Sequence, residues 1–139
     1  MTLERKISLL FAVSAFINWS LSIRGIIDPA GMSATFDGPP PEYAFVIRFW
    51  TGFVFMFGCM FWETSRDVVG KSALVKYNWI EKSVMATTVT IGYFAGQVSD
   101  RLMLLITLTN WAWIPVILYY DVRLRRHLRT SSAGTGVSA

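Results

Sequence analysis

Four apolar segments, each close to the length of a membrane-spanning helix, dominate this sequence of 139 residues. They run over residues 7–27, 43–62, 79–95 and 102–120, and crossing a bilayer as an α-helix takes about 20 mostly apolar residues. No run of about ten residues alternates strictly between polar and apolar side chains, as a membrane β-strand would. Because backbone groups in lipid must be paired, helices are the remaining solution. The sequence therefore predicts an all-α integral membrane protein.

The composition agrees with a membrane location. Hydrophobic residues make up 53% of the chain and charged residues only 16%, whereas an ordinary soluble domain is about 25% charged. A soluble domain of this size has too little interior to bury so many apolar side chains. The same composition excludes a disordered chain, and the single cysteine, Cys59, excludes a disulfide scaffold within the chain.

The connections between the segments predict an antiparallel four-helix bundle. Residues 28–42 include a run of three prolines, so this connection is not helical throughout. Residues 97–101 form a short turn, so the third and fourth spans are expected to be antiparallel neighbours. We expect a single transmembrane domain over residues 1–129, followed by a flexible polar tail over residues 130–139.

Basic residues indicate the orientation of this bundle. One side of it carries nine of them, namely Arg5, Lys6, Arg66, Lys71, Lys76, Arg123, Arg125, Arg126 and Arg129. The other side carries only Arg101. The positive-inside rule therefore places both termini in the cytoplasm, which suits a bacterial cytoplasmic (inner) membrane. The basic tail is then explained as a membrane-flanking cluster, so no nucleic-acid partner is expected.

The first segment also has features of a signal peptide, because Arg5 and Lys6 precede an apolar run. The apolar run continues well past Ala15, and no clean cleavage site is followed by a polar start. We therefore expect a retained membrane helix.

Four polar side chains share one depth near the middle of the membrane. When residues are counted from the cytoplasmic end of each span, Asn18, Thr87, Thr90 and Asn110 lie at the same depth. Such a layer either bonds helices to one another or binds the polar part of a ligand. Trp111 also lies deep, and its indole N–H needs an acceptor, so it is expected to face protein. Trp111 and Tyr93 are therefore further candidates for contact with a ligand.

Arg48 is the only charge in the second span and lies roughly 8 Å inside the outer boundary. Asp100 and Tyr93 are expected at a similar depth. Arg48 therefore has three interpretations: it snorkels to the headgroups, it forms a buried pair with Asp100, or it binds an anionic ligand.

Glu81 and Lys82 are adjacent near the inner boundary of the third span. Neighbours on a helix point about 100° apart, so we expect that they do not satisfy each other easily. The expectation is that one faces the bundle while the other snorkels, with Glu81 reaching Arg66 or an arginine of the tail.

Two further features concern helix packing. Gly92 and Gly96 form a G-x-x-x-G spacing, which favours close approach of another helix, either from the same chain or in a homodimer. Pro115 lies inside the fourth span and predicts a kink there.

Several kinds of chemistry lack the residues that they need. The single histidine, His127, excludes haem ligation by two histidines of this chain. No Cys/His cluster has zinc spacing, and no glycine loop precedes a lysine in a nucleotide-binding pattern. We therefore expect no metal and no cofactor. Four carboxylates remain as candidates for acid–base catalysis, namely Glu63, Glu81, Asp100 and Asp121.

The segments FVIRFWTGFVFMFGCMF, WIEKSVM, IGYFAG and TNWAWIP resemble a broad class of small four-helix bacterial inner-membrane proteins, many without an assigned function. The resemblance covers about Tyr43 to Tyr120. In that class an aspartate often stands at the position of Asn110, so this chain departs from a proton-linked role there. The resemblance implies the four-helix fold and no particular activity.

Three functions remain open. The first is a non-catalytic subunit or partner-binding protein of a membrane complex, which predicts a closed bundle with a large apolar outer face. The second is a binder or carrier of a lipid or other hydrophobic small molecule, which predicts a cavity lined by Asn18, Thr87 and Asn110. The third is a small intramembrane enzyme of the isomerase type, which requires two carboxylates facing one cavity.

Overall fold

The computed structural model describes residues 1–38 and 41–134, and these ranges are helical almost throughout and contain no strand. The predicted all-α class is confirmed. The elements in chain order are α1 (Leu3–Ile27), α2 (Pro29–Thr35), the 3-10 turn η1 (Pro41–Tyr43), α3 (Ala44–Arg66), α4 (Ser72–Phe94), α5 (Asp100–Ile106), the π-helical turn η2 (Thr107–Trp111) and α6 (Trp113–Gly134).

Three helical segments are long and apolar enough to cross a membrane. They are Leu3–Ile27, Ala44–Arg66 and Asp100–Thr130, and they contain most of the first, second and fourth predicted spans. The third predicted span, except its last residue, lies in α4, which carries Lys76, Glu81 and Lys82 and is less apolar for that reason.

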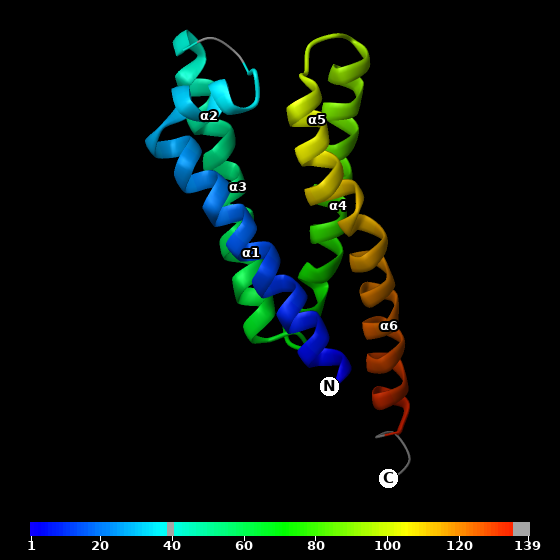
Figure 1. The fold of residues 1–139 in the computed structure, drawn as a ribbon. Helices are drawn as coiled ribbons and strands as arrows, with labels where there is room; N and C mark the ends of the chain where they lie inside the picture. Colours follow the sequence, from blue (N-terminus) through cyan, green and yellow to red (C-terminus); the bar gives the residue numbers. More distant parts are fainter. Residues whose placement is uncertain (39–40, 135–139) are drawn as a thin grey trace.

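The helices pack as two antiparallel hairpins (Figure 1). In the α1–α3 hairpin, α1 and α3 are in contact, and in the α4–α6 hairpin, α4 packs against α5, η2 and α6. The start of α1, the α3–α4 turn and the end of α6 lie at one end of the molecule, here called the junction end. The hairpins meet near this end and diverge toward the opposite, open end (Figure 1). The helices therefore do not form a closed bundle along their whole length.

Small side chains allow α1 and α3 to approach closely. A Cβ atom added to Gly25 would lie 2.4 Å from Cγ2 of Thr51, and one added to Gly58 would lie 2.6 Å from Cδ1 of Trp19. Most hydroxyl groups along this seam donate to carbonyls of their own helix, as Ser22 does to Asn18 O at 2.6 Å. Ser8 of α1 instead donates across the seam to Ser65 O of α3 at 2.7 Å. Close backbone packing of this kind drives helix association in lipid, where the hydrophobic effect does not.

An apolar cluster joins the hairpins at the junction end. Its buried members are Ile7, Phe11, Ala15, Phe61, Val68, Val75 and Leu124, which come from α1, α3, α4, α6 and the α3–α4 turn. Beside it, buried Asp121 of α6 accepts hydrogen bonds from Trp79 Nε1 at 3.2 Å and from Arg125 Nη2 at 2.6 Å. Trp79 belongs to α4, so this carboxylate holds α4 to α6. An arginine of the tail therefore pairs with Asp121 and not with Glu81.

The G-x-x-x-G spacing does not form one helical face. Gly96 lies beyond the end of α4 with φ +72°, and Gln97 N donates to Gly92 O at 2.9 Å while Gly96 N donates to Tyr93 O at 3.0 Å. This is the Schellman arrangement, in which glycine supplies the left-handed residue that ends a helix. The glycines therefore shape the turn between α4 and α5.

The fourth predicted span is interrupted by η2 ahead of Pro115. Ala112 N donates to Thr107 O at 3.0 Å, one residue further back than in an α-helix, and Pro115 then lies in the first turn of α6, where its missing N–H is tolerated. At the other end, α6 continues to Gly134, so residues 130–134 of the predicted flexible tail are helical. Residues 135–139 lie outside the described residues.

We predict that Gly58→Ala destabilises the α1–α3 seam while Gly52→Ala on the same helix does not. The new methyl group at Gly58 meets the rigid ring of Trp19, and such overpacking costs about 1–3 kcal/mol. Nothing lies within 4 Å of the corresponding position at Gly52, where the gain in helix propensity is about 1 kcal/mol. Unfolding in detergent followed by far-ultraviolet circular dichroism measures both changes, and equal effects at the two sites contradict this packing.

Candidate functional site

A cleft of about 430 Å³ lies between the two hairpins, a volume typical of small-molecule sites. Helices α1, α3 and α4 and the continuous segment of α5 and η2 each turn one stripe of side chains toward it at helical spacing. The stripe of α4 consists of Glu81, Lys82, Met85, Thr88 and Val89. The stripe of α5 and η2 consists of Leu102, Leu105, Ile106, Thr109 and Asn110. The cleft is therefore formed by regular helix faces, and not by a gap in one irregular loop.

Polar side chains line the cleft at its deep end. Helices α1 and α4 run away from the junction end, whereas α3 and α5 run toward it (Figure 1). The lining residues nearest the junction are consequently Asn18 and its neighbour on α1, Val54 on α3, Glu81 and Lys82 on α4, and Asn110 on η2. We call Asn18, Glu81, Lys82 and Asn110 the polar floor. The walls toward the open end are mainly apolar.

Glu81 and Lys82 form a buried ion pair on this floor. Their side chains are 8% and 6% exposed, and Oε2 of Glu81 lies 3.6 Å from Nζ of Lys82. This distance is beyond a hydrogen bond, and Oε2 accepts none from any described residue. Nζ also lies 5.6 Å from the ring centroid of Phe61. The expectation that one of the two side chains reaches the interface is therefore wrong, because both long side chains bend into the same cleft.

The two asparagines of the floor differ in their partners. Asn110 is 6% exposed, and its Nδ2 donates to Thr109 Oγ1 at 2.9 Å. Asn18 is 4% exposed, and its Nδ2 donates to no group in the described ranges. Asn78 lies one helical turn from Lys82 and is fully buried, and neither its Nδ2 nor its Oδ1 has a hydrogen-bond partner among the described residues. A buried unsatisfied polar group costs about 1–3 kcal/mol, so this end of the cleft has unused hydrogen-bonding capacity.

Half of the predicted midplane layer meets in the cleft. Asn18 and Asn110 line it, whereas Thr87 is exposed on another face of α4 and its neighbour Thr88 faces the cleft. Thr90 accepts a hydrogen bond from Trp111 Nε1 at 3.1 Å. Thr90 therefore bonds α4 to η2, and Trp111, although 41% exposed, has the acceptor that was expected for it.

The residues expected near the outer boundary lie away from the cleft. Arg48 is exposed, and its Nε donates to Ile26 O at 3.2 Å. Asp100 instead accepts a hydrogen bond from Tyr93 OH at 2.8 Å. The Arg48–Asp100 pair, one of the three interpretations of Arg48, does not form, because the two residues belong to different hairpins and the hairpins diverge at this end.

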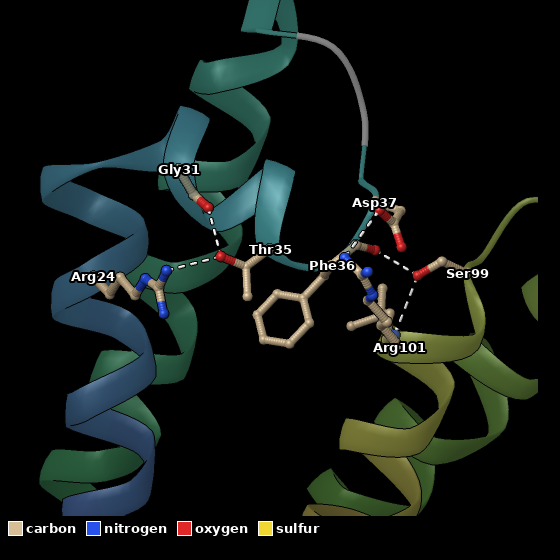
Figure 2. A network of polar contacts seen from close by, with 8 residues as sticks. Arg24, Gly31, Thr35, Phe36, Asp37, Ser99 and Arg101 are labelled. Atoms are coloured by element: carbon tan, nitrogen blue, oxygen red, sulfur yellow. Dashed lines mark hydrogen bonds and ion pairs between the residues drawn. The ribbon is translucent and has the colours of Figure 1, made fainter.

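A strap, formed by residues 29–38, crosses the open end of the cleft (Figure 2). Ser99 Oγ donates to Phe36 O, and Arg101 Nη1 lies 3.4 Å from Oδ1 of Asp37. On the other side, Arg24 Nη2 donates to Thr35 Oγ1 at 2.8 Å, which ties the strap to α1. Phe36 itself lines the cleft. The strap thus connects the hairpins where their helices are farthest apart.

The sequence carries a helix signal at the start of this strap. Asp28 caps α2 by accepting from Gly31 N at 2.9 Å, and Pro29 occupies the first helical turn. An Asx–Pro start is a known helix signal. It predicts the short helix, but it does not predict the contacts with Ser99 and Arg101.

No protein-family model matches this chain, and the comparisons with curated proteins and with solved structures found no match. The resemblance to small four-helix inner-membrane proteins therefore stays a prediction.

We predict that the strap keeps Asp37 beside Arg101 in the membrane-embedded protein. In a Cys59→Ser background, the pair Asp37→Cys and Arg101→Cys should cross-link rapidly with a short bifunctional thiol reagent. The matched control combines Asp37→Cys with Lys71→Cys, which lies at the junction end. Mobility on denaturing gels reports the cross-link, and similar yields for both pairs contradict the contact.

Proposed function

We propose that this chain is a membrane protein that binds a lipid or other hydrophobic small molecule, with the polar group of the ligand on the polar floor. The supporting observation is an apolar cleft that ends in buried polar groups without a full set of partners. Ionisable side chains inside a membrane are costly and are usually functional. Ligand sites combine mostly apolar walls with a few convergent polar groups, which is the chemistry of this cleft.

We further propose that α4 is the fourth span, that the antiparallel helices have both termini in the cytoplasm, and that the membrane is a bacterial inner membrane. The charges of Glu81 and Lys82 turn toward the cleft, while Ile80, Val84 and Ile91 are exposed on the outside of α4. Such a helix presents an apolar face to lipid despite its charges. The basic residues of the predicted cytoplasmic side gather toward the junction end, which supports this orientation.

The contacts of the carboxylates favour binding over acid–base catalysis. Of the four carboxylates considered for catalysis, Glu81 lines the cleft. Glu63 instead pairs with Lys71, Asp100 accepts from Tyr93, and Asp121 is held by Trp79 and Arg125. An enzyme of the isomerase type would need a second carboxylate facing the same cavity. A purely structural subunit has no evident use for a cleft with an unsatisfied floor.

For the topology, we predict opposite accessibility of the two ends. In a Cys59→Ser background, a membrane-impermeant maleimide should label Gln97→Cys in intact bacterial cells, because this turn lies at the open end. Thr130→Cys, at the junction end, should be labelled only after the cells are lysed. Labelling of Thr130→Cys in intact cells contradicts the cytoplasmic assignment.

For ligand binding, we predict that filling the cleft abolishes specific photolabelling. The probes are dodecyl chains with a diazirine and a hydroxyl, carboxylate or ammonium end, applied to the protein in lipid nanodiscs. Met85→Trp places a large ring in the cleft and should remove most of the cleft labelling found by peptide mapping. Val84→Trp is the control, because the adjacent Val84 is 60% exposed and does not line the cleft.

The outcomes of this experiment are distinct. Labelling of cleft peptides by at least one probe, sensitive to Met85→Trp and insensitive to Val84→Trp, supports the binding function. If none of the three probes labels the cleft above the level of the lipid-facing surface, the binding function is wrong.

A further inference from the structure

We infer that the cleft selects an uncharged amphiphile whose polar end is a hydroxyl group, in preference to one that ends in a carboxylate or an amine. This inference rests on the proposed binding function and adds the chemical class of the ligand. It follows from the charge and the hydrogen-bonding groups of the polar floor.

The first argument is the charge of the floor. Glu81 and Lys82 are the only charged residues that line the cleft in the described part of the chain. They are both more than nine-tenths buried and lie 3.6 Å apart, so the floor carries no net charge. A ligand carboxylate attracted by Lys82 would be repelled by Glu81. A ligand ammonium group would be attracted by Glu81 and repelled by Lys82. Charges interact more strongly in a protein interior than in water, and burying a third charge adds a desolvation cost.

The second argument is the set of unused hydrogen-bonding atoms. Nδ2 of Asn18 is a donor and Oε2 of Glu81 is an acceptor, and neither has a hydrogen-bond partner among the described residues. Both residues lie at the deep end of the cleft, together with the ammonium group of Lys82, which offers three donors. Both atoms are covered by neighbouring protein atoms, so each side chain has to turn toward the cleft to meet a ligand. A hydroxyl group has one donor and two acceptor lone pairs, so it can then donate to Glu81 while it accepts from Lys82 or Asn18. A ketone, ether or ester only accepts, and it would leave Oε2 of Glu81 unsatisfied.

The third argument is the position of this floor within the cleft. Toward the open end the walls include Leu21, Ile47, Met85 and Leu105, which suit an alkyl chain or a fused-ring skeleton. These walls offer no charged group to a second polar end in the described ranges. The ligand is thus expected to have one hydroxyl end on the floor and an apolar body along the walls.

The test ranks matched probes by displacement of the photolabel. Unlabelled dodecanol, dodecanoate and dodecylamine compete with the photoprobe that labels best, on the full chain in nanodiscs of neutral lipid. We expect dodecanol to displace the label at a concentration about tenfold lower than the other two, the size of effect expected for one uncompensated charge near a ligand. Dodecyl methyl ether, which cannot donate, should be weaker than dodecanol.

Two variants of the floor should change this preference in opposite directions. Glu81→Gln keeps the size of the side chain and leaves Lys82 uncompensated, so dodecanoate should gain relative to dodecanol. Lys82→Gln leaves Glu81 uncompensated, so dodecylamine should gain. Lys76→Gln is the matched control on the same helix, outside the cleft, and should leave the ranking of the wild-type protein unchanged. Size-exclusion profiles identify any variant that fails to fold, and the ranking on the wild-type chain needs none of them.

The result separates this inference from the proposed function. If dodecanoate or dodecylamine displaces the label as well as dodecanol does, the hydroxyl preference is wrong while ligand binding in the cleft stands. A dodecanol preference that both floor variants leave unchanged also overturns the inference. If none of the probes labels the cleft, both the proposed binding function and this inference are wrong.

Discussion

The arrangement of the molecule depends on an apolar contact at one end. The cluster around Phe11, Phe61 and Leu124 brings helices of both hairpins together beside the α3–α4 turn. Beyond it, each hairpin is held by its own contacts, through small residues between α1 and α3 and through Asp121 and Thr90 in the other pair. Because helices of the two hairpins pack against each other at this end, while the strap bridges them at the other, their inner faces separate along their length. The cleft is the direct consequence of this uneven packing.

The two buried carboxylates, Asp121 and Glu81, differ in how fully the protein satisfies their charge. Asp121 is 2% exposed and accepts from Trp79 and from two nitrogens of Arg125, so its charge is satisfied by the protein. Glu81 is similarly buried, but its nearest cation is beyond hydrogen-bond distance. In a low-dielectric environment such a loosely paired charge is costly. Asp121 is therefore a structural residue, whereas Glu81 has capacity left for a ligand.

The candidate site was partly predictable from distances along the chain. Counting residues at 1.5 Å each brings Asn18 and Asn110 to one depth, and both line the cleft. The same count cannot decide the rotation of a helix about its axis, which is why Thr88 and not Thr87 faces the cleft. The count also cannot give the direction in which a long side chain bends. Glu81 and Lys82 converge at their charged ends although their Cβ atoms diverge. The absence of an Arg48–Asp100 pair was not predictable, because it depends on the divergence of the hairpins.

Apolar length and charge spacing in the sequence were enough to predict the helical class, the ends of α1, α3, α4 and α5 at the open end to within two residues, and the one-sided distribution of basic residues. These properties are local, because a backbone in lipid must pair within its own segment. Which helix faces meet, and how far they remain in contact, depends on packing between residues distant in the chain. Only the tertiary structure could therefore place the polar floor at the deep end of an open cleft and set the strap across the other end.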